Sequence, residues 1–140
     1  NNLLITSQQI LGLKNSVEWI KSNKRSPFSQ NGQGLTHFEN IEALPYLLQL
    51  LELSYDPEIK LDHKLDRMWG LVVEGLQFLA LANKKNFKTV IKEMKLFIKN
   101  NNTLDNIEFL NRPIEEIKDK YYKNATENYT FETAKNKMVF

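Results

Sequence analysis

Hydrophobic residues recur every three or four positions through most of the chain, which is the spacing of one face of an α-helix. The stretch 61–82 keeps this spacing throughout and predicts a helix about 33 Å long at about 1.5 Å per residue. In its second half the opposite side is also apolar, with Trp69, Val73 and Phe78 there and Glu74 as the only charge. Because a helix that is apolar on nearly all sides needs several neighbours, we predict that 61–82 is the central helix of an all-α domain.

Four other segments have helical spacing, which predicts a bundle of about five helices. Ser7 and Asn40 are the expected N-caps, and Pro45 is tolerated because it falls in a first turn. The helices are predicted at 8–23, 40–54, 87–98 and from Pro113 to about 123. The residues predicted to face the core in these four helices are Ile10, Leu13, Val17, Ile20, Ile41, Leu44, Leu47, Leu48, Leu51, Phe87, Val90, Ile91, Met94, Phe97, Ile98, Ile114, Ile117 and Tyr121.

Polar and helix-breaking residues separate these segments. Residues 24–34 predict an exposed loop, and the corner at 55–58 ends a helix because the residue before Pro57 avoids the α region. We expect one domain over 1–123, followed by a tail, 124–140, that is irregular or held by a partner. Glycines inside the central helix predict the close approach of another backbone, since each glycine costs about 1 kcal/mol relative to alanine. These glycines are Gly70 and Gly75.

Composition narrows the class of protein. The chain has 140 residues, of which 41% are hydrophobic, enough to bury the core of one domain. Nineteen basic and 17 acidic residues give a net charge of +2. The overall electrostatic potential is therefore too weak to indicate binding to nucleic acid or to an acidic membrane. The absence of cysteine agrees with an intracellular protein. The longest apolar run is shorter than the ~20 residues that a membrane span requires, and no signal peptide is expected at the start of the chain.

Catalytic and metal-binding patterns are weak in this sequence. Asp62, His63 and Asp66 form one candidate acid-base cluster, which keeps a small enzyme among the hypotheses. The two aspartates also suit the start of a helix, where acids complement the dipole and pair with neighbouring cations. No nucleophile elbow, phosphate loop or metal-ligand spacing accompanies the cluster. We therefore predict no catalytic, cofactor-binding or metal-binding residue.

One helix has a strong charge bias, which supports an alternative function. Its lysines are predicted to face away from the core, either as a solvated surface or as contacts to nucleic acid in a free-standing bundle. These candidate contacts are Lys84, Lys85, Lys88, Lys92 and Lys95.

The order of a Pro-containing leucine helix, an Asp-Pro-Glu corner and a long apolar helix resembles armadillo or HEAT repeats. The resemblance rests on residues 43–51 (ALPYLLQLL), 56–60 (DPEIK) and 75–82 (GLQFLALA), and it covers about residues 41–100. The segment between Lys60 and Gly75 is longer than a regular repeat allows, and no second copy is visible. The resemblance implies an irregular stack of helices whose faces bind other proteins.

Within that superfamily, a first helix, a polar loop and the Leu-Pro-x-Leu-Leu motif at 44–48 are similar to the armadillo region of the AT-rich-interaction subunits of SWI/SNF-type chromatin remodellers. This resemblance implies a scaffold without catalytic activity in a nuclear, chromatin-associated assembly, with other protein subunits as its partners. From the residues themselves we predict partner contacts at Trp69, Glu74, Phe131 and Phe140.

Overall fold

The computed structural model describes the backbone of residues 2–25, 38–59 and 67–139, and the side chains of these residues except 2–6, 67 and 127–139. Within this described part the regular elements are five α-helices and two 3-10 helices, without a β-strand. The predicted all-α fold is confirmed. The elements are α1 (Asn2–Asn23), η2 (Ile41–Ala43), α3 (Leu44–Ser54), α4 (Arg67–Leu81), α5 (Lys84–Asn100), η3 (Ile107–Leu110) and α6 (Asn111–Val139).

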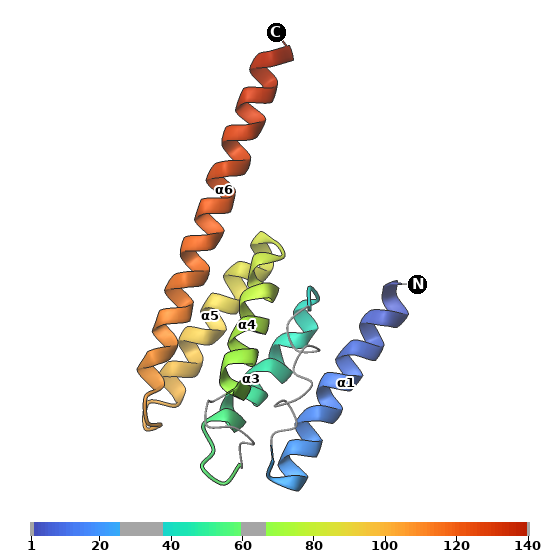
Figure 1. The fold of residues 1–140 in the computed structure, drawn as a ribbon, viewed down its shortest axis with the longest axis vertical. Helices are drawn as coiled ribbons and strands as arrows, with labels where there is room; N and C mark the ends of the chain where they lie inside the picture. The colour runs from blue at the N-terminus through green and yellow to red at the C-terminus, as the bar shows by residue number, and fades with distance from the viewer. Residues whose placement is uncertain (1, 26–37, 60–66, 140) are drawn as a thin grey trace.

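The five α-helices lie side by side in chain order, and each contacts the next (Figure 1). Helix α4 also contacts α6, so it has α3, α5 and α6 as neighbours. Helix α6 is the longest, and its C-terminal half extends beyond the other helices (Figure 1). The bundle is therefore organised around α4, as the apolar stretch in the sequence predicts.

Helix α4 is enclosed on most of its circumference but not on all of it. Gly70 and Glu74 are exposed, and Phe78 one turn later keeps 37% of its surface in contact with solvent. These three residues are four apart, so they form one strip along the helix. The expected enclosure is confirmed on the sides that face α3, α5 and α6, and it is wrong for this strip. Residues 61–66 of the predicted helix lie outside the described residues. The buried side chains of α4 are Met68, Val72, Leu76, Leu79 and Ala80.

The apolar stripes of the other four helices converge on one core. Every residue that the periodicity assigned to these stripes is buried or half-buried, from Leu13 on α1 to Ile117 on α6. Burying a large aliphatic or aromatic side chain stabilises a fold by roughly 1.5–3 kcal/mol. The rings of Phe87 on α5 and Tyr121 on α6 stack with centroids 3.8 Å apart. The predicted stripes are confirmed, and together they hold the helices in place.

Two asparagines begin helical segments. The Asn40 side chain accepts a hydrogen bond from the Glu42 N–H at 2.9 Å and caps η2, which continues into α3. Pro45 lies in the first turn of α3, where its missing N–H costs nothing. The Asn83 side chain caps α5 by accepting from the Asn86 N–H at 2.8 Å. The expected cap at Asn40 and the expected place of Pro45 are confirmed.

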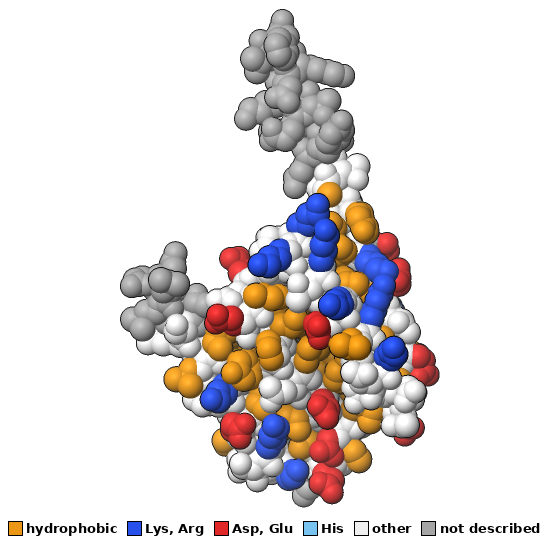
Figure 2. Space-filling view, turned by 180° about the vertical axis from the view of Figure 1, so that it is seen from behind, with side chains coloured by type: hydrophobic (Ala, Val, Ile, Leu, Met, Phe, Trp, Pro, Cys, Tyr) orange, Lys and Arg blue, Asp and Glu red, His pale blue; other side chains and the backbone are white. Residues whose placement is uncertain are grey.

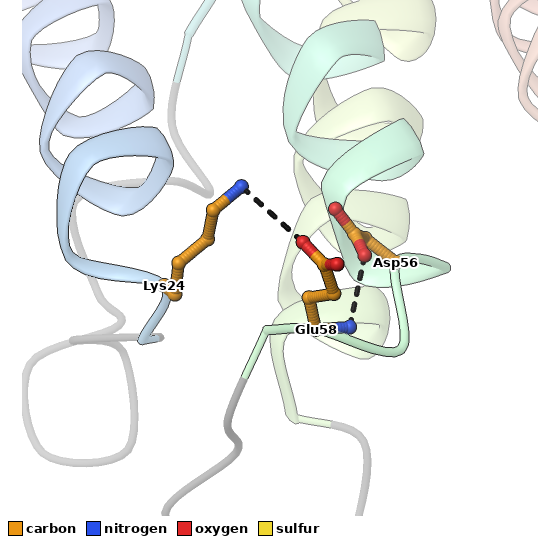
Figure 3. Close-up of polar contacts among 3 residues, drawn as sticks. All are labelled: Lys24, Asp56 and Glu58. Atoms are coloured by element: carbon orange, nitrogen blue, oxygen red, sulfur yellow. Dashed lines mark hydrogen bonds and ion pairs between the residues drawn. The ribbon is translucent and has the colours of Figure 1, made fainter.

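The corner after α3 turns as expected and also meets the end of α1 (Figure 3). Asp56 Oδ1 accepts a hydrogen bond from the Glu58 N–H at 2.9 Å, which closes a tight turn around Pro57. The Glu58 carboxylate lies 3.8 Å from the Lys24 ammonium (Figure 3). Because both side chains are more than half exposed, this ion pair contributes at most about 1 kcal/mol.

Three expectations about the helices are wrong. Ser7 is not an N-cap, because the helical backbone of α1 begins at Asn2. For the segment after residue 123 the irregular alternative is wrong, because α6 continues as one helix to Val139, while contact with a partner stays a prediction. No glycine or proline interrupts the chain between Ile114 and Val139, so nothing in it ends the helix. An alanine methyl group at Gly70 would meet no atom within 4 Å, so no backbone approaches it closely.

Candidate protein-binding groove and lysine row

A groove with a volume of about 790 Å³ opens between the C-terminal end of α3, the first half of α4, and the segment that leads through η3 into α6. We call it the Trp69 groove. Its lining is mainly apolar, with three aromatic rings that come from three separate parts of the chain. The apolar and aromatic lining residues are Tyr55, Trp69, Val73, Phe109 and Pro113.

Local structure sets the position of two of the rings. Trp69 Nε1 donates a hydrogen bond to the Tyr55 hydroxyl at 2.9 Å, which joins the end of α3 to α4. The Tyr55 ring lies 6.5 Å from the ring of Phe97 on α5, and it packs against the core. Both residues are half-buried, and a hydrogen bond between rings that also pack on the core restricts their rotation. Tyr55 and Trp69 therefore form a stable wall of the groove.

The third ring is far more accessible. Phe109 in η3 exposes 63% of its surface, the most among the exposed large apolar residues of the described part. Asn106, just before η3, has a φ of 61°, a left-handed conformation that asparagine tolerates better than most residues. The turn and η3 after it supply Asn106 and Phe109 to the lining of the groove. An exposed aromatic ring in the same groove as two anchored rings is a surface that a partner can cover.

Charged side chains also line the Trp69 groove. Arg112 Nε lies 3.3 Å from the Glu116 carboxylate one turn later on α6. The two side chains are 85% and 52% exposed, so the pair is weak. Asp105 adds a second carboxylate, so acids outnumber cations among the lining residues. The groove therefore suits an apolar group that is accompanied by a positive charge.

Two of the four predicted partner contacts, Trp69 and Glu74, are described, and they lie in different hollows. Trp69 lies in the groove, whereas Glu74 and Phe78 line a separate shallow hollow, also on α4. Glu74 is exposed. Phe131 belongs to the part of α6 whose side chains are not described, and Phe140 lies outside the described residues. The sequence offered no periodic signal for Tyr55, in a corner, or for Phe109, in a segment of mixed character.

The lysines of α5 form a second candidate site. All five predicted contacts are exposed, and Lys99 continues them at the end of the helix. At 100° per residue these side chains fall within an arc of about 100°. We call them the lysine row, which consists of Lys84, Lys85, Lys88, Lys92, Lys95 and Lys99. Seen from behind, lysine and arginine side chains gather toward the place where α6 leaves the body (Figure 2).

Helix α6 adds a cation to this row. The hydrogen bond that Lys95 can accept from the Lys118 ammonium in its neutral form lowers the pKa of Lys95, and the positive charge of Lys118 lowers it further. The same hydrogen bond raises the pKa of Lys118, whose ammonium also lies 3.4 Å from the Glu115 carboxylate. The fold thus places two lysines from different helices next to each other. The periodicity of either helix alone does not predict this contact.

The candidate acid-base cluster cannot be placed, because Asp62, His63 and Asp66 lie outside the described residues. Among the residues that are described, no group of three or more acidic or histidine side chains is arranged to hold a metal ion. None of the helices in the described ranges is long and apolar enough to cross a membrane. Comparisons with models of protein families, with curated proteins and with solved structures find no significant match.

Proposed function

We propose that this chain is a protein–protein interaction module without catalytic activity, and that its partner binds in the Trp69 groove. The observation that carries the proposal is the groove itself, which the exposed ring of Phe109 lines together with the hydrogen-bonded rings of Trp69 and Tyr55. Tryptophan, tyrosine and arginine dominate the energetics of protein interfaces, and all three line this groove. The partner segment presents an apolar side chain to the rings and a basic side chain to Asp105 or Glu116.

The arrangement of the helices supports a scaffold role. Side-by-side packing in chain order is the geometry from which short helical superhelices are built. The resemblance of residues 41–100 to armadillo and HEAT repeats supports the same role. Its similarity to the AT-rich-interaction subunits of SWI/SNF-type remodellers extends the proposal to a structural part of an intracellular, nuclear, chromatin-associated assembly. Other protein subunits are then the partners.

Site-specific crosslinking tests this proposal. A photoreactive phenylalanine analogue replaces Phe109 in the groove or, as a control, Leu11 on α1, since these positions expose similar fractions, 63% and 56%. The full chain is then irradiated in an extract of the cells that express it. We expect a defined protein to crosslink at position 109 but not at position 11, and competition by wild-type chain to remove it.

The same crosslinked products at both positions, or none at 109, would refute the groove as a binding site. A crosslink at 109 to a second copy of the chain would replace the proposed partner with self-association. The variant Phe109→Ser supplies an independent measure. Because the side chain is mostly exposed, this substitution should leave the thermal midpoint within about 2 °C while it weakens partner binding at least tenfold.

A further inference from the structure

We propose that the lysine row, together with Lys118, is a second binding site, and that its ligand is the phosphate backbone of a nucleic acid. The site goes beyond the Trp69 groove, because it lies on α5 and α6 and shares no residue with the groove lining. It requires no catalytic group. It requires only a line of cations whose spacing and accessibility suit a line of phosphates.

The charge of α5 is concentrated and one-sided. The helix carries six lysines and one acid, Glu93, whereas the whole chain has a net charge of only +2. The rest of the chain is therefore net acidic, and the positive potential is local to this helix. Glu93 lies about 100° around the helix from Lys92 and outside the arc of the lysine row. A polyanion approaching the chain is therefore attracted to this face.

The geometry of the row is linear. From Lys85 to Lys99 the row extends about 21 Å along the helix axis, with a lysine every 4.5–6 Å. One strand of duplex DNA carries a phosphate about every 3.4 Å along its axis, so a single strand offers several phosphates over this length. Each lysine brings three hydrogen-bond donors on a flexible stem that can adjust to the phosphate positions. The row therefore permits several simultaneous contacts to one backbone.

The contact between the two helices adds a reason for an anion to bind there. Lys95 and Lys118 are close enough for each to alter the pKa of the other, and Glu115 is the carboxylate next to them, 3.4 Å from Lys118. A phosphate can accept charge-assisted hydrogen bonds from both ammonium groups, which cannot hydrogen-bond to each other while both are protonated. Because α5 and α6 are in contact, an oxyanion with more than one acceptor can reach lysines of both helices at this position.

A nucleic acid fits this surface better than a membrane does. An amphipathic helix binds a membrane through its apolar face, but the apolar face of α5 is closed into the core, with Val90 and Met94 fully buried. Leu96 is the one large apolar residue of α5 that is exposed, at 41%. A single leucine side chain buries too little apolar surface in a bilayer to hold the helix there. What remains for a ligand to recognise is a line of charges, which matches a phosphate backbone.

Salt dependence tests the proposal quantitatively. The full chain is titrated into a fluorescein-labelled 20-base-pair duplex of mixed sequence, with anisotropy read between 50 and 300 mM salt. We expect dissociation constants in the range of about 1–100 µM near 0.1 M salt, with a slope of log affinity against log salt of about −4 to −5 for five contacts. The charge-removing variant Lys88→Gln/Lys95→Gln should make this slope shallower by about 2.

Matched controls separate this site from unspecific charge and from the groove. The variant Lys14→Gln/Lys21→Gln removes two exposed lysines of α1 and has the same net charge as the row variant. It should leave the slope unchanged, and so should Phe109→Ser. An equal loss of affinity in both lysine variants would overturn the proposal, as would binding that ignores salt. Stronger binding to vesicles with 30% phosphatidylserine than to the duplex would assign the row to a membrane surface instead.

Discussion

Asn86 is the one polar residue that the core of the described part encloses, and only 4% of its surface is exposed. Its side-chain amide donates to the Glu39 carbonyl at 2.8 Å and to the Leu79 carbonyl at 3.1 Å. Leu79 is close to the end of α4, and Glu39 lies just before η2. A single amide therefore joins the start of α5 to the end of α4 and to the segment before η2, which is 47 residues away in sequence. We predict that Asn86→Ala destabilises the fold by about 2–3 kcal/mol.

The magnitude follows from the two hydrogen bonds. Each contributes roughly 0.5–1.5 kcal/mol net, and a buried carbonyl left without a partner costs about 1–3 kcal/mol. The Leu79 carbonyl keeps a bond of 3.4 Å from the Ala82 N–H, and Glu39 is an exposed residue, so the two lost hydrogen bonds and the space left by the amide account for most of the change. The higher helix propensity of alanine offsets about 0.5 kcal/mol of the loss. For a domain of this size the sum lowers the thermal midpoint by roughly 10 °C.

Urea unfolding followed by circular dichroism at 222 nm measures the change. Asn15→Ala is the matched control, since Asn15 is exposed on α1 and its loss should alter stability by less than about 0.5 kcal/mol. Asn86→Asp separates hydrogen bonding from packing, because it keeps the shape of the side chain but removes both donors. At pH 7 its carboxylate faces two carbonyl oxygens, so it should destabilise more than Asn86→Ala does.

The aspartate variant also predicts a pH dependence with a defined sign. Burial against two carbonyls raises the folded-state pKa of the introduced carboxyl above its unfolded value. Stability is then higher where the carboxyl is protonated, and it falls as the pH rises through the unfolded-state pKa of about 4. The deficit relative to wild type should shrink toward acidic pH. If Asn86→Asp were as stable as wild type at pH 7, the donor role of Asn86 would be wrong.

Three further predictions follow from burial and charge. Gly70→Ala should stabilise the fold by up to about 1 kcal/mol, since the methyl group meets nothing within 4 Å; a loss in urea midpoint would contradict this. Leu76→Ala should cost about 2.7–5 kcal/mol, whereas Leu11→Ala should cost under about 0.5, because Leu76 is fully buried and Leu11 is 56% exposed. Lys118→Met should raise the pKa of Lys95 toward its usual value, as an NMR titration of the lysine Cε resonances would report.

The sequence determined the faces of the helices. A stripe such as Leu13, Val17 and Ile20 is set by the 3.6-residue period, and any fold that keeps these helices has to bury those sides. Asn40 and Pro45 mark the start of a helical segment through local hydrogen bonding and sterics, which also depend only on neighbouring residues. The length of α6 also depends on local sequence, but the hydrophobic periodicity did not predict it. The polar segment after residue 123 lacks an apolar stripe. The helix continues through it because no glycine or proline interrupts this segment.

Only the tertiary structure decided which residues meet. Tyr55, Trp69 and Phe109 come from three elements, and no local period relates their positions, so the groove exists only once α3, α4 and η3 are packed together. Lys95 and Lys118 likewise become neighbours through the contact between α5 and α6.

In the sequence Asn86 stands between lysines and asparagines as one more polar residue. Asn86 is buried because the segment before η2 and the end of α4 pack around its side chain. These segments meet only in the folded protein, so the position of Asn86 along its own helix does not predict its burial.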